Sequence, residues 1–477
     1  GYQILPRDSL DIIKGGSLGF TSKIVQSNIT TSGFDLSWGT NDSASTNGNY
    51  GISTTLGTVV TNGTNSITHS LSITGLQPAS FYHVQCYSTK GIDTVFSAIG
   101  LYATASNSSG IIRPYFNHSI DSNVATNAIA QNINNHINDT IKAYIDLAKS
   151  TLDICVYNAS DSTIASAIND AYNRGVQVRY IIDDNASNNI LNSLNPNIIV
   201  KKKDSLLAGI MHNKFVIIDK NTVNNSWVIS GSTNWTDNNI SDDYNNIIFI
   251  QDQALAKAYT IEFDEMWAGL FGSKKRDNTP HNFNVGGNKV ELYFSPTDQT
   301  TSQILKFIDN VNYSFEFGLL AFTQNTIGLA VIDKHGQTGV DIRGIIEQEN
   351  ISGSKFSDLV VGGVNVKSHQ GVTHQLHHKY AIADANALSS DPSVLTGSHN
   401  WSNNAENNSD ENTIVIHNAT IANIYLQEFT KRFNELGASD INDLVAVEID
   451  VFPNPTSRTV YVKSDLDIQE IKLYTIE

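Results

Sequence analysis

The sequence predicts an α/β protein built from two pseudo-symmetric halves that form one domain, preceded by an all-β module. A stretch that reads apolar-His-x-Lys, an apolar run ending in Asp, and then Gly-Ser-x-Asn-Trp occurs at 211–235 and again at 376–401. Strand-like and helix-like stretches alternate around both copies, which is typical of an α/β layered architecture. Between 20 and 105 the pattern changes to short alternating strands separated by turn residues, which indicates an all-β module.

The composition is that of a globular chain with an acidic surface. Of the 477 residues, 40% are hydrophobic, which supports a sizeable core, and the length suggests two to four domains. Only 16% are charged, and the net charge is −17. A tight, sequence-independent grip on DNA needs many cationic phosphate contacts, so the overall charge disfavours that class of function.

Cysteine usage and hydropathy say little about the compartment. Cys86 and Cys155 lie in apolar strand-like stretches of different predicted domains, so we expect two buried thiols rather than a disulfide. No apolar run reaches the roughly 18–20 residues of a transmembrane segment. The chain opens with Gly1 and Tyr2 and has no signal peptide, so we expect any signal to have been removed or to lie outside this chain.

Residues 1–106 form the predicted all-β module, a β-sandwich. Trp38 on an early strand, and Tyr82 shortly after Leu76-Gln77-Pro78, resemble a fibronectin type III domain, in which Tyr82 would be the corner tyrosine. The resemblance implies either a spacer or a module that holds the rest of the chain near a polymer or a surface. No residue of this module suggests chemistry.

Residues 107–275 form the first predicted half and begin with the linker 107–110. Asp161 or Ser162 is expected to cap the second helix, and Gly175 to end it. The expected elements are a strand at 111–116, a helix at 138–150, a strand at 151–157, a helix carrying Ile164, Ile168 and Tyr172, a strand at 176–182, and a closing helix at 255–270.

Residues 276–437 form the second predicted half and repeat this order. Gly175–Arg179 aligns with Gly339–Arg343, outside the repeated motif, which favours duplication of a whole fold rather than of a site alone. Two halves in one chain form a two-copy site without dimerising, so we expect a monomer. The expected elements are a strand at 313–322, a helix at 326–335, a strand at 340–346, and a closing helix at 419–436.

Each copy of the motif predicts a buried strand that carries polar side chains at its start. In the first copy the apolar run 215–218 is typical of a strand buried on both faces. His212 and Lys214 are two residues apart, so both point to one side of that strand. A second strand near 227–229 ends just before Asn234, which follows in the turn. Two such sets facing each other make a pocket of two His, two Lys and two Asn, which suits a phosphodiester.

The duplicated His-x-Lys…Asp motif resembles the phospholipase D superfamily, and the likeness runs from about 112 to 437. The resemblance implies a phosphodiesterase that uses no cofactor and no metal. One histidine attacks phosphorus to give a phosphohistidine; the other protonates the leaving alcohol and then activates water. We favour His212 as the nucleophile and His377 as the general acid. The spacers 221–226 and 386–392 are longer than is usual in the family and look like enlarged hairpin turns.

The resemblance also assigns the remaining site residues. Lys214 and Lys379 are expected to bind phosphoryl oxygens, together with the amides of Asn234 and Asn400. Ser232 and Ser398 are expected to lie alongside these amides. The full set of expected catalytic residues is His212, Lys214, Asn234, His377, Lys379, Asn400 and Glu411, with Asp219, Ser232, Asp384 and Ser398 in support.

The acidic residues divide into two roles. Asp219 and Asp384 end their strands and are expected to tie down loops. Glu411 is expected to orient an imidazole, as an acid at this place does in the family. Asn245 stands at the matching position of the first half, where an amide cannot stabilise an imidazolium as a carboxylate does. Asp242 or Asp243 is therefore an alternative partner there.

Several further histidines crowd the second motif, which raises the question of a zinc site. The spacing of His374, His377 and His378 matches no structural or catalytic zinc pattern, so we expect no metal. The other two are His369 and His399.

Residues 438–477 resemble the start of a type IX secretion sorting tail. The features are an acidic linker, Pro453-Asn454-Pro455, and strand-like runs at 460–463 and 471–474. Such tails continue further, so we expect the chain to be cut short at Glu477. The resemblance implies contact with the type IX secretion machinery and then surface anchoring or release.

Three functions follow from the sequence. The first is a secreted phospholipase D-like enzyme that hydrolyses a phospholipid headgroup ester. The second is a secreted nuclease that uses the same motif without a metal. The third is a non-catalytic surface-binding protein that uses the β-module, a reading that the intact duplicate motifs disfavour.

Overall fold

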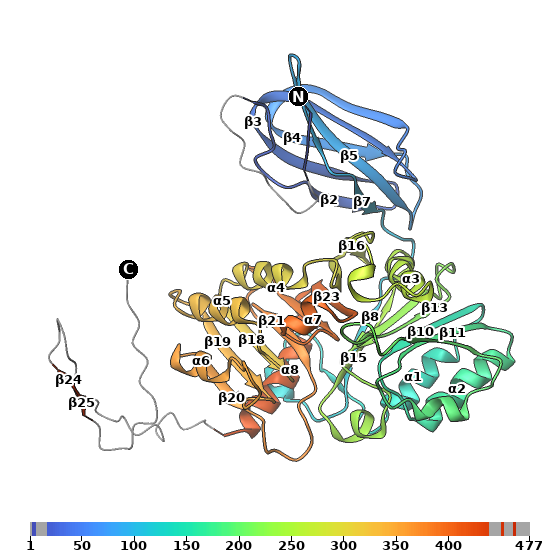
Figure 1. Cartoon of the computed structure of the whole chain (residues 1–477), viewed down its shortest axis with the longest axis vertical. Coiled ribbons are helices and arrows are strands. Elements are labelled where there is room, and N and C mark those ends of the chain that lie inside the picture. The colour runs from blue at the N-terminus through green and yellow to red at the C-terminus, as the bar shows by residue number, and fades with distance from the viewer. Residues whose placement is uncertain (1, 6–16, 438–449, 453–460, 464–477) are drawn as a thin grey trace.

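The computed structural model describes residues 2–5, 17–437, 450–452 and 461–463, with side chains for 17–437. The β-module stands above an α/β body whose two halves lie side by side (Figure 1). The prediction of an α/β fold for the body is confirmed, while the β-sandwich predicted in front of it stays a prediction.

The module at the N-terminus is a seven-stranded sheet in the order β1-β6-β5-β3-β2, with β4 paired to β3 and β7 to β5. The long strand β3 pairs with β2 and β4 along its first part and with β4 and β5 further on, which bends the sheet around an apolar core. The Tyr82 hydroxyl accepts a hydrogen bond from the Gln77 N–H at 3.0 Å, the contact of a corner tyrosine. The fibronectin type III assignment stays a prediction. The strands are β1 Tyr2–Leu5, β2 Val25–Thr30, β3 Gly33–Gly51, β4 Thr58–Thr74, β5 Phe81–Lys90, β6 Asp93–Ser97 and β7 Gly100–Ala103.

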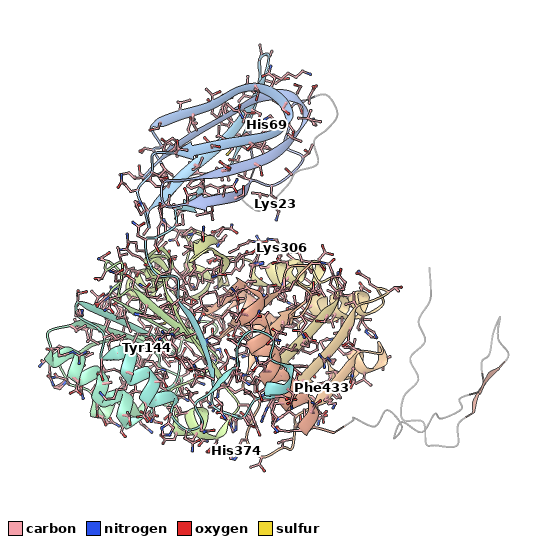
Figure 2. All side chains as sticks on the ribbon, turned by 180° about the vertical axis from the view of Figure 1, so that it is seen from behind. Lys23, His69, Tyr144, Lys306, His374 and Phe433 are labelled. Atoms are coloured by element: carbon pink, nitrogen blue, oxygen red, sulfur yellow. The ribbon has the colours of Figure 1, made fainter. Side chains whose placement is uncertain are left out.

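Polar contacts join the module to the α/β body. The Asn284 side chain donates to the Ile29 carbonyl at 2.8 Å, and the Lys257 ammonium donates to the Ala79 carbonyl at 2.8 Å. His69 and Lys23 lie on the module and Lys306 on the body below it (Figure 2). The module therefore contacts both halves of the body, because Lys257 belongs to the first half and Asn284 to the second half.

The first half is an eight-stranded sheet in the order β12-β11-β10-β13-β14-β15-β8-β9. Asp161 caps α2, since its side chain accepts from the Ile164 N–H, as the sequence predicts. Its elements are β8 Ile112–Phe116, η1 Ser122–Val124, β9 Gln131–Asn132, α1 Ile137–Ile145, β10 Thr151–Val156, α2 Ser162–Asn173, β11 Gln177–Asp183, η2 Asn189–Ser193, β12 Ile199–Lys203, β13 Lys214–Ile218, β14 Trp227–Gly231, η3 Asn238–Asp242, β15 Asn246–Gln251, α3 Gln253–Trp267 and η4 Gly272–Lys274.

The second half repeats this strand order, β20-β19-β18-β21-β22-β23-β17-β16. The parallel pair β18–β19 and the antiparallel pair β18–β21 match β10–β11 and β10–β13 of the first half. Its elements are β16 Asn282–Val285, β17 Asn288–Ser295, α4 Thr300–Asp309, β18 Ser314–Leu319, α5 Asn325–His335, β19 Asp341–Ile346, α6 Phe356–Val361, β20 Asn365–Ser368, β21 Lys379–Ala383, β22 Ser393–Gly397, α7 Asn403–Asn407, β23 Glu411–His417 and α8 Ala419–Glu435.

Three apolar cores hold the α/β body together. One lies between α1, α2 and the outer face of the first sheet, and a second between α4, α5 and the outer face of the second sheet. The third contains residues of both sheets and of α3 and α8, so the halves share it. Strands β13, β14, β21 and β22 are buried along their whole length, as their continuous apolar runs predict.

Each helix and strand predicted in the two halves is present, with ends that shift by a few residues. The sequence analysis missed α4 and the short helices α6 and α7. Among the described residues, no helix combines the length and the apolar character that crossing a bilayer requires. Beyond 437, β24 (Asp450–Phe452) pairs with β25 (Tyr461–Lys463); the predicted linker and the strand at 471–474 lie outside the described residues.

A buried lysine links the halves and provides a test of the fold. The Lys275 ammonium contacts Glu262 of α3 and lies 3.1 Å from Asp410 of the second half. Burial alone lowers the pKa of Lys275, but these two carboxylates outweigh burial and raise it.

We expect Lys275→Met to destabilise the protein by about 3–5 kcal/mol, because two buried carboxylates lose their cation. Thermal and denaturant unfolding of the whole chain would measure this. Lys202→Met is the matched control, since Lys202 has a side chain that is 54% exposed. Equal unfolding midpoints for the two variants would show that the buried contact does not hold the halves.

Candidate active site

Two reciprocal backbone bridges bring the repeated motifs together. Met211 forms a parallel bridge with Asp410, and Leu376 forms one with Tyr244. The His212 N–H donates to the Asp410 carbonyl and the His377 N–H to the Tyr244 carbonyl, each at 2.9 Å. Each motif histidine therefore lies just before its strand and is hydrogen-bonded through its backbone N–H to a residue of the other half.

The strand register places a lysine beside each histidine. In the sheets, Lys214 lies opposite Val156 of β10, and Lys379 opposite Leu319 of β18. The Lys214 ammonium donates to the His212 carbonyl at 2.9 Å, and Lys379 donates to the His377 carbonyl at 2.7 Å. All four side chains are buried.

The two histidines have different partners at Nδ1, and each partner comes from the opposite half. His212 Nδ1 lies 2.9 Å from both carboxylate oxygens of Glu411. His377 Nδ1 lies 3.0 Å from Asn245 Oδ1. An amide oxygen only accepts, and so does the Glu411 carboxylate when it is ionised; in that state each neutral ring carries its proton on Nδ1 and keeps the lone pair on Nε2. The alternative partners Asp242 and Asp243 do not take this role: Asp243 accepts from the Gln375 N–H and the Asn239 amide instead.

The serines of the two Gly-Ser-x-Asn-Trp sequences hold these partners in place. Ser232 donates to Asn245 Oδ1 at 2.8 Å. Ser398 hydrogen-bonds Glu411 and also accepts from the Asn412 N–H at 3.1 Å. The serines thus orient the groups that orient the histidines.

The two motif asparagines have unused hydrogen-bonding capacity. The Oδ1 atoms of Asn234 and Asn400 are buried, and neither has a hydrogen-bond partner among the described residues. Such groups are rare in folded proteins unless a ligand satisfies them. Since the oxygen and nitrogen of an amide are interchanged by rotation, both side chains can present an N–H to an anion.

The site is short of negative charge. Burial lowers the pKa of Lys214 to about 7, and burial together with the Lys214 charge holds the pKa of Lys379 well below its usual value. Burial, Lys214 and Lys379 hold the pKa of His212 well below its usual value. Burial raises the pKa of Glu411 to about 7, although Lys214 opposes this rise. A bound anion would offset the positive charges and allow both lysines to stay protonated.

The remaining motif residues have structural roles. Asp219 accepts from the backbone N–H groups of Lys149, Ser150 and Thr151, and Asp384 from those of 312–314. Both aspartates therefore fasten loops, as expected. Trp235 and Trp401 are buried in the outer cores.

Two of the extra histidines near the second motif, His369 and His378, are hydrogen-bonded to other side chains. His378 lies between Asn246 and Glu428, at 3.1 Å from each. His369 Nδ1 lies 2.7 Å from Glu347. The exposed His374 lies on a loop at the side of the body away from the module (Figure 2). The group of potential metal ligands found in the part of the chain that the structure describes includes none of these histidines.

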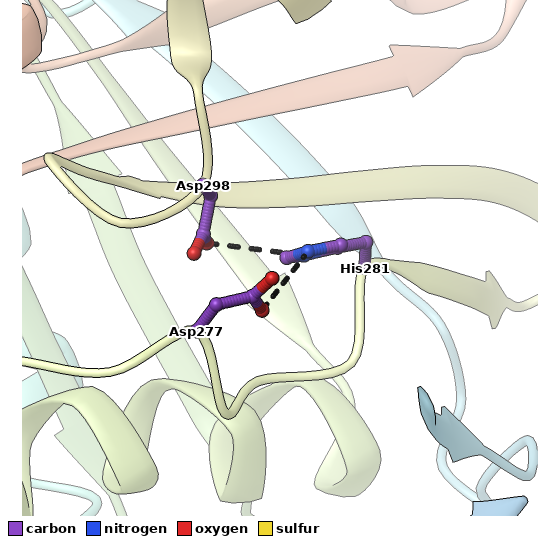
Figure 3. A group of neighbouring side chains, drawn as sticks. All are labelled: Asp277, His281 and Asp298. Atoms are coloured by element: carbon purple, nitrogen blue, oxygen red, sulfur yellow. Dashed lines mark ion pairs between the residues drawn. The ribbon is translucent and has the colours of Figure 1, made fainter. Parts of the chain in front are cut away.

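One group of potential metal ligands occurs among the described residues, on other elements than the motif strands. Asp277, His281 and Asp298 offer ligand atoms within 4.8 Å of one another. The His281 ring lies beside both carboxylates (Figure 3), with Nε2 3.7 Å from Asp277 and Nδ1 3.8 Å from Asp298. His281 Nδ1 also lies 3.0 Å from the Leu292 carbonyl.

Sequence reasoning missed Tyr157. Its ring centroid lies 5.0 Å from that of His212 and 5.4 Å from the Lys214 ammonium. Tyr157 lies far from the motif in the chain, and only the pairing of β10 with β13 brings it there.

Comparison with known proteins places this site in a family. The family profile described as "Cardiolipin synthase, PLD-like domain" matches residues 141–267 and 304–433, together more than half of the chain. Among curated proteins, a mitochondrial cardiolipin hydrolase of Xenopus tropicalis is 32% identical over 123 residues, which are 25% of this chain and 56% of that protein. A phospholipase D of Rickettsia bellii is 35% identical over 117 residues, 24% of this chain and 56% of that protein. The chain thus spans about half the length of these relatives.

Solved structures also resemble the chain. A phosphatidylserine synthase from Haemophilus influenzae aligns with 69% of this chain and 89% of its own, at 12% identity and a TM-score of 0.47. A phospholipase D family member, Nuc from Salmonella typhimurium, aligns with 31% of this chain and 95% of its own, at 24% identity and a TM-score of 0.26.

The lowered lysine pKa values predict how anion binding depends on pH. We expect the affinity for dimethyl phosphate, a monoanion throughout the range used, to fall as pH rises through about 7. The reason is that Lys214 loses its proton in this range, and the anion then loses a cationic partner.

Calorimetric titration between about pH 6 and about pH 9 would measure this dependence. Lys214→Met is expected to bind weakly at every pH, and Lys202→Met to behave as the wild type. An affinity that stays constant across the range would contradict the lowered lysine pKa.

Proposed function

Because the chain belongs to the family of cardiolipin synthase-like, PLD-like domains, we propose that it is a phosphodiesterase that acts through a phosphohistidine. The observation that carries this proposal is the cross-pairing of His212 with Glu411 and of His377 with Asn245. Each pairing leaves an Nε2 for chemistry, and the charges of Lys214 and Lys379 act on both imidazoles. One site thereby holds a nucleophile, an acid and the donors that a phosphoryl group requires.

In the first step, His212 Nε2 attacks phosphorus and the bond from phosphorus to the leaving alcohol breaks. The alcohol oxygen takes the Nε2 proton of His377. The histidine ring of the phosphoenzyme becomes positively charged, and the Glu411 carboxylate at 2.9 Å stabilises that charge. Lys214 and Lys379, with the amides of Asn234 and Asn400, hold the phosphoryl oxygens.

In the second step, the now neutral His377 takes a proton from water while the water oxygen attacks phosphorus. The bond between phosphorus and His212 Nε2 breaks, which returns a neutral His212, a protonated His377 and a phosphomonoester. His377 must be protonated to begin the cycle, although burial, Lys379 and Lys214 lower its pKa. The substrate's negative charge offsets the two lysines and thus promotes that protonation.

The unequal partners support the choice of His212 as the nucleophile. The nucleophile becomes positively charged when phosphorylated, so it gains from a carboxylate. The acid must release its proton to the leaving group, and a neutral amide such as Asn245 holds that proton less tightly than a carboxylate does. Glu411 faces His212 and Asn245 faces His377, as this division requires.

The proposed substrate is a phospholipid headgroup ester. Support comes from the names of the relatives, a cardiolipin hydrolase and a phospholipase D, and from the net charge of −17, which disfavours a polyanion such as DNA. We further propose export by type IX secretion, on the tail resemblance, and a spacer or surface-binding role for the β-module.

The substrate assay compares choline release from phosphatidylcholine vesicles with nicking of a supercoiled plasmid. We expect release without nicking. Nicking without release would show a nuclease instead. Failure of both, and of bis-p-nitrophenyl phosphate, would leave a non-catalytic binding role.

Substitution of each histidine tests the division of roles. With bis-p-nitrophenyl phosphate the leaving group needs no proton, so we expect His377→Asn to release one p-nitrophenolate per enzyme in a burst and then stall. His212→Asn should show no burst. Steady-state kcat should fall by about 10²–10⁴-fold in both variants.

Mass spectrometry of the stalled His377→Asn enzyme at neutral pH should locate the phosphoryl adduct on His212. Lys202→Met, an exposed substitution, is the control for handling. A burst in His212→Asn but not in His377→Asn would reverse the roles. Turnover by the wild type with an adduct on neither histidine would rule out the covalent route.

Substitution of the two partners tests the asymmetry. Glu411→Gln keeps the shape but removes the negative charge, so we expect kcat to fall by at least about 10²-fold, since the comparable change in a catalytic triad costs about 10⁴. Asn245→Asp adds a charge beside His377, which raises the pKa of that acid and should move the pH optimum upward. Steady-state kinetics from about pH 5 to about pH 9 would show both effects. A larger loss from Asn245→Asp than from Glu411→Gln would contradict the assigned roles.

A further inference from the structure

The two half-sites differ at one position next to the lysines. In the first half, the residue after Val156 is Tyr157, whose N–H donates to the Asn213 carbonyl at 3.0 Å. In the second half, the residue after Leu319 is Leu320, whose N–H donates to the His378 carbonyl at 2.9 Å. The two positions are equivalent in the sheets, yet one has an aromatic ring and the other an aliphatic chain.

Tyr157 contacts both chemical groups of its half. Its ring meets that of His212 at an interplanar angle of 62° and a centroid distance of 5.0 Å. The Lys214 ammonium lies 5.4 Å from the centre of the same ring, within the range of a cation–π interaction. The tyrosine itself is half-buried.

We propose that Tyr157 is a positioning residue whose ring holds the Lys214 ammonium charged and the His212 imidazole in place, making the two half-sites unequal. The proposal rests on the proposed function for its catalytic consequence. The predicted effect of Tyr157 on anion affinity does not depend on catalytic turnover. Leu320 has no ring to offer Lys379.

The physical basis is the negative face of the aromatic ring. Burial disfavours the charged form of Lys214, and the ring supplies part of what water would supply. Other groups also face Lys214: Glu411 and Cys155 favour its charge, and the positive charge of Lys379 opposes it. Glu411 is also hydrogen-bonded to His212, so the ring acts where the site has little other negative charge to offer Lys214.

Three variants separate the ring from the hydroxyl and from general packing. Tyr157→Phe keeps the ring, and Tyr157→Leu copies the residue that the second half carries in the same register. Tyr313→Leu is a matched control, because Tyr313 is 50% exposed and lies outside the motif strands. The measurements are dimethyl phosphate affinity by calorimetry and kinetics with bis-p-nitrophenyl phosphate, each from about pH 6 to about pH 9.

We expect Tyr157→Phe and Tyr313→Leu to stay within about twofold of the wild type. Tyr157→Leu should bind dimethyl phosphate about 5- to 30-fold more weakly near neutral pH, the range between an exposed and a desolvated cation–π contact. Its affinity should also be lost at lower pH than in the wild type, because Lys214 without the ring gives up its proton sooner. KM should rise in parallel.

Fluorinated phenylalanines at 157 keep the proposal testable if Tyr157→Leu does not fold. Added fluorines weaken the negative ring face without changing its shape, so affinity should fall stepwise with fluorine number. Equal affinity across the fluorine series, or an unshifted pH dependence in folded Tyr157→Leu, would overturn the proposal. A loss in Tyr157→Phe as large as in Tyr157→Leu would also overturn it. A wild type that binds dimethyl phosphate but turns over no diester would refute the proposed function alone.

Discussion

The site depends on the two backbone bridges that cross between the halves, from Met211 to Asp410 and from Leu376 to Tyr244. Each bridge places a motif histidine beside the next residue of the partner strand, which is Glu411 for His212 and Asn245 for His377. Neither half by itself contains both a motif histidine and the residue that is hydrogen-bonded to its Nδ1. The shared core between α3, α8 and the two sheets is therefore a requirement of the chemistry as well as of stability.

Local patterns account for the part of this arrangement that the sequence could predict. Continuous apolar runs such as 215–218 mark buried strands, and the two-residue spacing of His212 and Lys214 places both on one side. Asp161 could be predicted as a cap because an N-cap acts on residues three positions away. Because the sequence is duplicated, the helices and strands of the second half could be predicted from those of the first. All these inferences rest on contacts within a few residues or on repetition.

Contacts between distant segments account for the rest. Lys203 ends a run of three lysines, yet its ammonium is buried and donates to the carbonyls of Leu207 and Gly209. The choice among Asp242, Asp243 and Asn245 as partner of His377 depends on the path of the chain after η3, which residue types do not determine. Tyr157 could not be recognised because its relation to Lys214 exists only through strand pairing.

The two halves have similar buried hydrogen-bond networks, although the residues next to their motif histidines differ. Asn412 reaches across to Asn213 and accepts from Ser230, and its counterpart Asn246 reaches across to His378 and accepts from Thr396.

These amides are buried, and a buried amide left without partners costs about 1–3 kcal/mol, so both networks must stay satisfied in either half. The residues beside the motif histidines and lysines, by contrast, differ between the halves. Glu411 corresponds to Asn245, and Leu320 corresponds to Tyr157. The proposed mechanism needs two histidines in unequal roles, one that accepts a phosphoryl group and one that gives a proton. The two halves share one fold but place different residues beside their histidines, which meets that need within one chain.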